Sequence, residues 1–447
     1  MPDASSLIEK YGLREEITTH LKNLIRINTT NPPGNELAAA QYIAGVFSRE
    51  GIDSIILESV PGRASIIARQ KGDGSKRPLL LMSHLDVVGV EEEKWTHKPF
   101  GADEIDGVIW GRGALDCKNS VALWMTIIIA LKRSGMGPKR DVIFLSAADE
   151  ETGGSKGCEW LVKNHFNLLD AEAALNEGGG FGIDFMGKTF YTYQSAEKGN
   201  IWLRVTARGT PGHASMPRED NPVTRLAFLI NKFTHKKYPL KVTPSVKKMI
   251  EAMASSRNAI VGTVIKQLMN PLLSNVLIRL AIKDAGTSAG FRAMLHNTVC
   301  PTVFHAGQKT NVIPSEAVAE FDFRVLPPYD PEEFYSETVK EIGPGFEIEV
   351  LDKKAGTESP VDHELAHLIR KTMNRHKPDA MVVPFLIPGV TDGVFFRPRG
   401  MVVYGFTPVL PLDDISLTHG HDERISIESL EFSLKVGLEV VLDFVNK

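Results

Sequence analysis

Two uncharged apolar runs that end in acidic residues or histidine constrain this chain more than any other feature. Leu79-Leu80-Leu81-Met82 leads into Ser83-His84-Leu85-Asp86, and the run from Val142 to Ala148 leads into Asp149-Glu150-Glu151. Short apolar runs of this kind are typical of strands buried in an α/β sheet, whose carboxyl ends form the usual ligand-binding edge. Carboxylates gathered there repel one another unless a cation lies among them. The two runs therefore predict an α/β fold with a metal site at one edge of its sheet.

Length and composition describe an ordinary globular protein of two domains. The chain has 447 residues, 43% of them hydrophobic and 24% charged, with a net charge of -4. This length exceeds the size at which one core keeps growing. The overall charge gives no reason to expect nucleic acid or an anionic membrane as partner. The N-terminal residues have no basic start followed by an apolar segment, and the three cysteines have no metal-type spacing, so we expect a reducing, cytoplasmic location.

The order of predicted elements places a second domain inside the first. Helix is predicted from about Leu13 to Gly51, and strands then alternate with helices, such as 120–134, up to about Leu175. A new alternating strand at 201–207 opens an α+β region, with helices at 222–234 and 331–342 and strands near 302–306, 317–325 and 346–351. A helix at 361–376 resumes the first domain. The predicted boundaries are 1–197 and 354–447 for the catalytic domain and 198–353 for the insertion.

The segment from Ile260 to Ile282 is unusually apolar. Polar residues and Pro271 interrupt it, whereas a transmembrane helix needs about 20 mostly apolar residues. We predict no transmembrane segment here, but helices packed on the inserted domain. An alternative is that the segment helps to form an apolar substrate channel.

Five residues that follow predicted strands or loops have the chemistry of metal ligands. They are His84, Asp116, Glu151, Glu177 and His419. Two zinc ions about 3.5 Å apart need a bridging carboxylate together with further nitrogen and oxygen ligands. Asp86 lies two residues after His84 and faces the same way in a strand, so its carboxylate could hold the other ring nitrogen of that histidine. Taken singly, each position has a simpler explanation, such as a structural His-Asp pair or a helix-capping aspartate.

Seven motifs, taken in order, resemble one known family. They are Ser83-His84-Leu85-Asp86-Val87-Val88, Gly111-Arg112-Gly113-Ala114-Leu115-Asp116, Asp149-Glu150-Glu151, Asn176-Glu177-Gly178-Gly179, Gly212-His213-Ala214-Ser215, Asn311-Val312-Ile313-Pro314 and Phe321-Asp322-Phe323-Arg324. The set resembles the dinuclear zinc amidohydrolases that include aminoacylase, glutamate carboxypeptidase, succinyl-diaminopimelate desuccinylase and carnosine dipeptidase. The branch of N-fatty-acyl-amino-acid hydrolases and vacuolar-type carboxypeptidases is the most similar. The resemblance implies a zinc-peptidase-like catalytic domain, with a central mixed sheet flanked by helices, and an inserted lid and dimerisation domain.

The resemblance also implies roles for single residues. Asp116 resembles the bridging carboxylate, with His84 and Glu177 completing one zinc site and Glu151 and His419 the other. Glu150 resembles the general base, and Asp116-Cys117 a cis peptide bond. His421 competes with His419 as ligand, but the family places the ligand four residues before a glutamate, here Glu423.

Further implied roles fall in the inserted domain. His213 resembles a lid histidine that reaches the partner subunit's active site and stabilises the oxyanion. Arg324 resembles a residue that binds the substrate's carboxylate, and Asn311 a companion polar contact. Without the family, a locally hydrogen-bonded turn histidine explains His213 equally well, and a structural salt bridge is the alternative for Arg324.

These expectations together predict a hydrolase with two Zn²⁺ ions, or Co²⁺ or Mn²⁺ in their place. We expect it to cleave an amide bond in an N-acyl amino acid, or the C-terminal peptide bond of a dipeptide or short peptide, with a zinc-bridged water activated by Glu150. Its partners would be a small-molecule substrate and a second copy bound through the lid domain, and no nucleic acid. The alternatives are an aminopeptidase-type enzyme that recognises a free amine and a non-catalytic metal-binding scaffold. A phosphate-binding protein is a weaker alternative, because Gly178-Gly179-Gly180 lacks a P-loop lysine.

Overall fold

The chain forms two units in the computed structural model, which describes residues 3–447. The first unit contains residues up to Ser195, Ser359–Phe385 and Thr391–Lys447, and the second contains Ala196–Glu358 and Leu386–Val390. The second unit thus includes the predicted insertion of residues 198–353, a few flanking residues and a short return segment.

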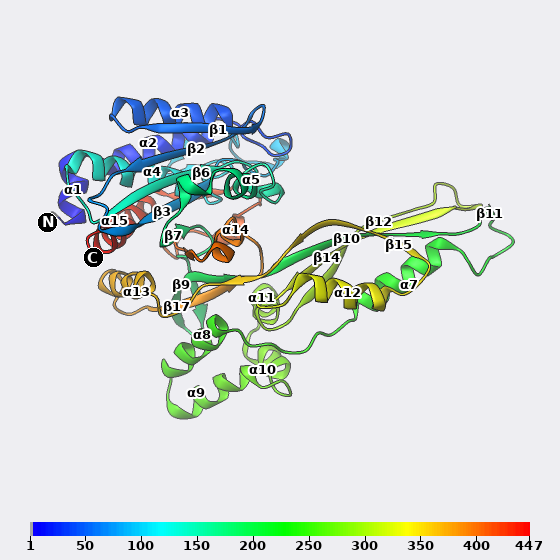
Figure 1. Ribbon diagram of the computed structural model, residues 1–447. Helices are drawn as coiled ribbons and strands as arrows, with labels where there is room; N and C mark the ends of the chain where they lie inside the picture. The colour runs from blue at the N-terminus through cyan, green and yellow to red at the C-terminus, as the bar shows by residue number, and fades with distance from the viewer. Residues whose placement is uncertain (1–2) are drawn as a thin grey trace. The chain divides into compact units, whose positions relative to one another are not determined.

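A mixed sheet forms the centre of the first unit, with strands in the order β1-β2-β6-β3-β7-β18-β9 (Figure 1). The four central strands β6, β3, β7 and β18 run parallel, and β1, β2 and β9 are antiparallel to their neighbours. The strands of this sheet are β1 Ser54–Val60, β2 Arg63–Gln70, β3 Lys76–His84, β6 Arg140–Ala147, β7 Ala173–Asn176, β18 Val402–Gly405 and β9 Lys188–Glu197, and β8 Gly182–Phe185 and β17 Met381–Ile387 also pair with β9.

Helices cover both faces of this sheet, as the uniformly apolar central strands require. Successive residues of β3 point to opposite faces: Leu79 and Leu81 belong to one core cluster, and Leu80 and Met82 belong to another. The first cluster also contains residues of α1 Ala4–Tyr11, α2 Leu13–Arg26, α3 Leu37–Arg49, α4 Lys118–Ser134, α13 Glu364–His376 and α15 Ile427–Val445. The second contains residues of α5 Cys158–Asn164, α6 Phe166–Leu169 and α14 Gly393–Phe396. The predicted central mixed sheet flanked by helices is confirmed.

The prediction of helix throughout 13–51 is wrong in the middle. Helix α2 ends at Arg26 and α3 begins at Leu37. Asn31-Pro32-Pro33-Gly34 lies in the gap, and proline both removes a backbone donor and disfavours helix at the residue before it. The resulting loop brings Asn31 to the functional site.

A small three-stranded sheet joins distant parts of the first unit. Its order is β19-β5-β4, formed by Arg424–Ser426, Val108–Trp110 and Asp103–Ile105. Arg424 pairs with Trp110, so the residues just before β19 lie beside the loop that follows β5.

The second unit has a four-stranded antiparallel sheet with the order β12-β14-β10-β15, formed by Thr298–Ala306, Glu316–Val325, Gly199–Arg208 and Phe346–Lys354. Alternate residues of β10, such as Leu203 and Val205, are buried in a core with Phe233 of α7 and Phe334 of α12. Helices α7 Pro222–Thr234 and α12 Pro331–Ile342 have the predicted bounds. The short strands β11 Gly212–His213 and β13 Val312–Ile313 pair with each other.

Four helices lie between α7 and β12, where the sequence has its apolar segment. They are α8 Pro244–Ser255, α9 Ala259–Lys266, α10 Ser274–Ala281 and α11 Ala285–Leu295, with the 3-10 helix η3 Gln267–Met269 after α9. In the described part of the chain, no helix combines the length and the hydropathy needed to cross a membrane.

Candidate metal centre

Strand ends of the main sheet place three of the five predicted ligands at one edge. His84 ends β3 opposite Ala147 of the parallel strand β6, and Glu151 follows Ala147 in the 3-10 turn η2 Glu150–Thr152. Glu177 follows β7, which is parallel to β3 on its other side. Parallel strands bring their carboxyl ends to the same edge, so the sheet itself gathers these side chains.

Asp116 lies between two histidines that are far apart in the sequence. Its Oδ1 is 3.0 Å from His84 Nε2, and its Oδ2 is 3.1 Å from His419 Nε2. Each carboxylate oxygen thus faces a different imidazole, which is the arrangement that a bridging carboxylate needs.

The other two carboxylates complete two groups of possible ligand atoms. Glu177 Oε2 is 3.6 Å from His84 Nε2, and Glu151 Oε2 is 3.1 Å from His419 Nε2. One group comprises His84, Asp116, Cys117 and Glu177, the other comprises Asp116, Glu151 and His419, and the ligand atoms within each group lie within 4.8 Å of one another. Asp116 is common to both groups, so the geometry suits two cations that share one carboxylate.

The electrostatics of the site favour positive charge. Burial raises the pKa of Glu151 to about 7 and also raises that of Glu177. Hydrogen bonds to Asp116 and Glu151 raise the pKa of His419 to about 10. Among the described residues, the buried Glu151 Oε1 has no hydrogen-bond partner. A buried carboxylate oxygen without a donor fits a site made for a metal ion.

Glu150 lies beside the ligands but contacts neither histidine by a hydrogen bond or ion pair in the described structure. Burial, together with the neighbouring Glu177 carboxylate, raises the pKa of Glu150 well above its usual value. A carboxylate with a raised pKa accepts a proton readily, as a general base must.

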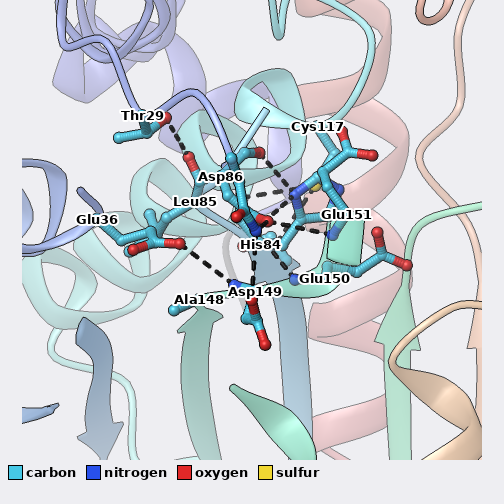
Figure 2. Close-up of polar contacts among 12 residues, drawn as sticks. Thr29, Glu36, His84, Leu85, Asp86, Cys117, Ala148, Asp149, Glu150 and Glu151 are labelled. Carbon is cyan, nitrogen blue, oxygen red and sulfur yellow. Dashed lines mark hydrogen bonds and ion pairs between the residues drawn. The ribbon is translucent and has the colours of Figure 1, made fainter. Parts of the chain in front are cut away.

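Asp86 is placed differently from the prediction. His84 Nδ1 donates to the main-chain oxygen of Asp86 at 2.9 Å, while the Asp86 carboxylate is 3.6 Å from that nitrogen. The carboxylate accepts instead from the main-chain N–H groups of Glu150 and Glu151, both at 3.1 Å (Figure 2). The buried carboxylate of Asp86 therefore orients the turn that carries Glu150 and Glu151.

A polar network that the sequence does not reveal supports the same turn. Asn31 Nδ2 donates to Asp86 Oδ2 at 2.8 Å and to Thr152 Oγ1 at 3.0 Å. Asp149, which has a φ of 70°, accepts from Arg63 Nη2 at 2.7 Å. No linear motif points to Asn31 or Arg63, because they lie far from the turn in the sequence; the proline-rich interruption around Asn31 is the only local signal.

Glu423 holds the loop that carries Asp116. Its fully buried carboxylate accepts from the main-chain N–H groups of Gly113, Leu115 and Asp116 and from Arg112 Nη1, at 2.6–3.0 Å. The sequence identified this glutamate only by its spacing from His419. In the structure Glu423 holds the main chain at Asp116, and the peptide bond between Asp116 and Cys117 is cis, as the resemblance implies.

The structure separates the two competing histidines and accounts for the cysteine. His419 contacts Asp116 and Glu151, whereas His421 Nε2 lies 3.0 Å from Glu91 Oε2 at the surface. Cys117 Sγ accepts from the main-chain N–H of His84, and burial raises the pKa of its thiol. Burial disfavours the thiolate form, so packing is the simpler role for Cys117.

The remaining predicted site residues belong to the second unit. His213 Nδ1 lies 2.7 Å from Ser215 Oγ and 3.2 Å from the main-chain nitrogen of Ser215, so this ring nitrogen is engaged within its own turn. Asn311 lies beside this turn, because its carbonyl oxygen accepts from Ala214 N at 3.1 Å. Arg324 forms a bidentate ion pair with Asp322 through Nε and Nη2, at 2.8 and 2.9 Å. Three N–H groups of Arg324, two on Nη1 and one on Nη2, remain for contact with a substrate carboxylate.

Comparison with known proteins gives consistent matches. Residues 80–443 match the model of peptidase family M20/M25/M40. The N-fatty-acyl-amino acid synthase/hydrolase PM20D1 of Homo sapiens is 29% identical, over 99% of this chain and 89% of its own length. Aminoacylase-1 of Homo sapiens is 28% identical, over 91% of this chain and 90% of its own length. The crystal structure of an M20 family metallo-carboxypeptidase, Sso-CP2 from Sulfolobus solfataricus, has a similar fold, with a TM-score of 0.75, 19% identity and coverage of 96% of this chain and 99% of that chain.

Proposed function

Because the chain belongs to peptidase family M20/M25/M40, we propose that it is a two-metal hydrolase that cleaves the amide bond of an N-acyl amino acid or the C-terminal peptide bond of a short peptide. The observation that carries this proposal is the placement of Asp116 between His84 and His419, with a further carboxylate on each side. Nitrogen and oxygen donors of this kind suit zinc, with cobalt or manganese as alternatives.

Five residues would hold the metal ions. His84 and Glu177 would bind one ion, Glu151 and His419 the other, and Asp116 both. When bound, the ions would lower the pKa of a water from about 15.7 towards 7 and polarise the substrate carbonyl.

Glu150 then moves the proton. A carboxylate oxygen of Glu150 takes a proton from the attacking water and delivers it to the nitrogen of the leaving amine. The Asp86 carboxylate fixes the position of Glu150 through the main-chain N–H of that residue, so the base does not depend on a flexible side chain alone. A positioned general base contributes about 10²- to 10⁴-fold to the rate.

Residues of the second unit would bind and stabilise the substrate. Because Nδ1 of His213 is engaged with Ser215, Nε2 is the ring nitrogen that would donate to the oxyanion that forms during amide cleavage. The remaining N–H groups of Arg324, on Nη1 and Nη2, can bind the substrate's free carboxylate, with Asn311 as a second polar contact. The curated relatives named N-fatty-acyl-amino acid synthase/hydrolase support an apolar acyl group.

Glu150→Gln tests the general base. The substitution keeps the shape of the side chain and none of the five ligands changes, so metal content should stay at the wild-type level while turnover falls at least about 100-fold. Metal content is measured by elemental analysis and turnover with N-acyl amino acids. An active variant with full metal content would refute the role of Glu150.

A substrate panel tests the reaction. N-acetyl and long-chain N-acyl amino acids, dipeptides and free-amine substrates are compared on metal-loaded protein, with Arg324→Ala beside the wild type. The proposal expects hydrolysis of substrates with a free carboxylate, and a raised KM for Arg324→Ala. Preference for free-amine substrates, unaffected by Arg324→Ala, would identify an aminopeptidase. No hydrolysis of any substrate by protein with two bound metals would support a scaffold.

We also infer that two copies pair through the second unit and that His213 serves the partner's active site. Glu150→Gln and His213→Ala are each expected to be inactive, but a mixed dimer of the two retains one site with both groups intact. Co-expression with two different tags and purification of the mixed dimer tests this inference. Failure to recover activity in the mixed dimer, or a monomer in sedimentation, would refute it.

A further inference from the structure

Exposed apolar side chains gather on helices α9 and α10 of the second unit and in the turn just before α10. Six of the 18 exposed large apolar side chains among residues 3–447 fall between 260 and 280. They are Ile260, Val264, Leu272, Leu273, Val276 and Leu280, and Leu272 is 85% exposed. Scattered exposed apolar residues are normal, but a concentration of this kind marks an interaction site. We call these six residues the apolar face.

The segment that carries the apolar face is also basic. Residues 257–283 contain Arg257, Lys266, Arg279 and Lys283 and no aspartate or glutamate. The whole chain has a net charge of -4, so the overall composition conceals this local excess of positive charge. An apolar surface with basic flanks is typical of helices that lie on anionic membranes.

A basic cavity adjoins helix α10. Its volume is about 650 Å³, and its lining includes Lys237, Arg279 and Arg292 but no acidic side chain. Tyr238 also lines it. Cationic side chains without an acidic side chain among them suit an anionic group such as a phosphate. We call this the basic pocket.

Helix α10 places the apolar face and the basic pocket side by side. Residues four apart lie on one face of a helix, and successive residues are rotated by about 100°. Ser274 and Ile278 are buried, Asn275 and Arg279 line the basic pocket, and Val276 and Leu280 are exposed. Around the helix, the two residues that line the basic pocket therefore lie between the two buried residues and the two exposed apolar residues. Residues that bind lipid headgroups occupy the same intermediate position on a helix that lies on a membrane.

We propose that the apolar face and the basic pocket together dock the protein on an anionic lipid surface. The apolar side chains enter the acyl region, and Lys237 and Arg279 bind phosphate-bearing headgroups. Helices α9 and α10 have eight residues each, so they lie on the membrane and do not cross it. A second copy of the chain fits this surface less well, because a symmetric interface would place the basic segments of both copies against each other.

Vesicle sedimentation with the full, metal-loaded chain tests the proposal. Binding to phosphatidylcholine vesicles is compared with binding to vesicles that also contain phosphatidylglycerol, at low and high NaCl. The wild type is expected to bind the anionic vesicles more strongly, and NaCl should weaken the binding. Equal binding to both vesicle types, or no binding to either, would overturn the proposal.

Two pairs of substitutions separate the parts of the surface. Lys237→Gln/Arg279→Gln should lower partitioning to anionic vesicles roughly 30-fold, since each basic residue contributes about fivefold. Val276→Ser/Leu280→Ser should lower it at least roughly tenfold, because these side chains would no longer enter the acyl region.

The control substitutions replace residues of the same chemical type that lie outside the apolar face and the basic pocket. Lys309→Gln/Lys340→Gln removes two exposed lysines of the same unit, and Leu412→Ser removes an exposed leucine of the first unit. Neither control should change vesicle binding, and thermal unfolding by circular dichroism should be the same for all variants. Loss of binding in the controls would show that the effect is not specific to this surface and would refute the proposal.

Two other occupants are outcomes of the same experiment. If Val276→Ser/Leu280→Ser converts a dimer into a monomer and leaves vesicle binding unchanged, a second copy covers the apolar face. If the basic pocket binds inorganic phosphate in calorimetry while the wild type binds no vesicles, the pocket serves a free anion. Either result overturns the membrane assignment.

Discussion

Replacement of Glu423 by glutamine tests how the chain fixes Asp116, the proposed bridging carboxylate. Each carboxylate oxygen of Glu423 accepts two hydrogen bonds: Oε2 from Arg112 and Gly113, and Oε1 from Leu115 and Asp116. Glutamine has the same shape, but in either orientation its NH₂ group faces two donors. The buried Arg112 guanidinium also loses its charged partner.

The expected magnitude follows from these contacts. Breaking a buried ion pair by removing one partner costs about 3–5 kcal/mol, and each buried donor left without an acceptor costs about 1–3 kcal/mol. Part of the loss is relieved when the loop moves, so the free energy of unfolding should fall by about 3–5 kcal/mol in metal-free protein. Movement of Asp116 should also weaken metal binding roughly 10- to 100-fold, as the loss of groups that orient metal ligands does.

Urea unfolding of metal-free protein measures the first effect, and metal titration by calorimetry measures the second. Glu431→Gln is the matched control, because Glu431 pairs with Arg14 only at 3.7 Å on the surface. The control should stay within about 0.5 kcal/mol of the wild type. A Glu423→Gln variant that matches this control in both measurements would refute the role given to Glu423.

Three further predictions concern the hydrogen bond from Asn31 to Asp86, the protons released when metal binds, and the hydrophobic core of the second unit. Asn31→Ala removes the amide donor to Asp86 and should lower kcat roughly 10- to 100-fold while the melting temperature changes little; a wild-type kcat would contradict this. Metal binding should release protons, because the pKa of His419 is raised to about 10 without metal and the ligand nitrogen must be unprotonated, so affinity should fall as the pH is lowered from 10. Titrations in two buffers of different ionisation enthalpy measure this release, and an affinity independent of pH would contradict it. Phe233→Ala should destabilise the second unit by about 3–5 kcal/mol in urea unfolding, whereas Phe304→Ala, at a side chain 45% exposed, should cost less than about 1 kcal/mol.

Local patterns of the sequence were enough to predict most of the secondary structure and the chemistry of the site. The apolar runs before His84 and Glu151 form buried parallel strands, because only a strand covered on both faces keeps an uninterrupted apolar sequence. Helices α7 and α12 begin and end as predicted, since Pro222 and Pro331 follow capping residues. The prediction of one helix through 13–51 was wrong where the prolines interrupt it.

The tertiary structure decided which groups orient the proposed metal ligands. Asn31 and Glu423 reach the site from loops that are distant in the sequence, and hydrogen bonds between distant loops leave no periodic pattern. The Asp86 carboxylate binds the Glu150 turn instead of the His84 ring, because strand direction fixes the side of the sheet but not the nearest donor. The choice between His419 and His421 likewise depends on which ring meets Asp116.

The sequence by itself therefore determined the sheet, the set of acids and imidazoles, and the family that they indicate. These depend on residue type and on short-range periodicity, and both can be read directly from one amino-acid sequence. Only the tertiary structure determined how the carboxylates are held and where the basic, apolar surface of α9 and α10 is exposed, because burial and contact arise when segments far apart in the chain meet.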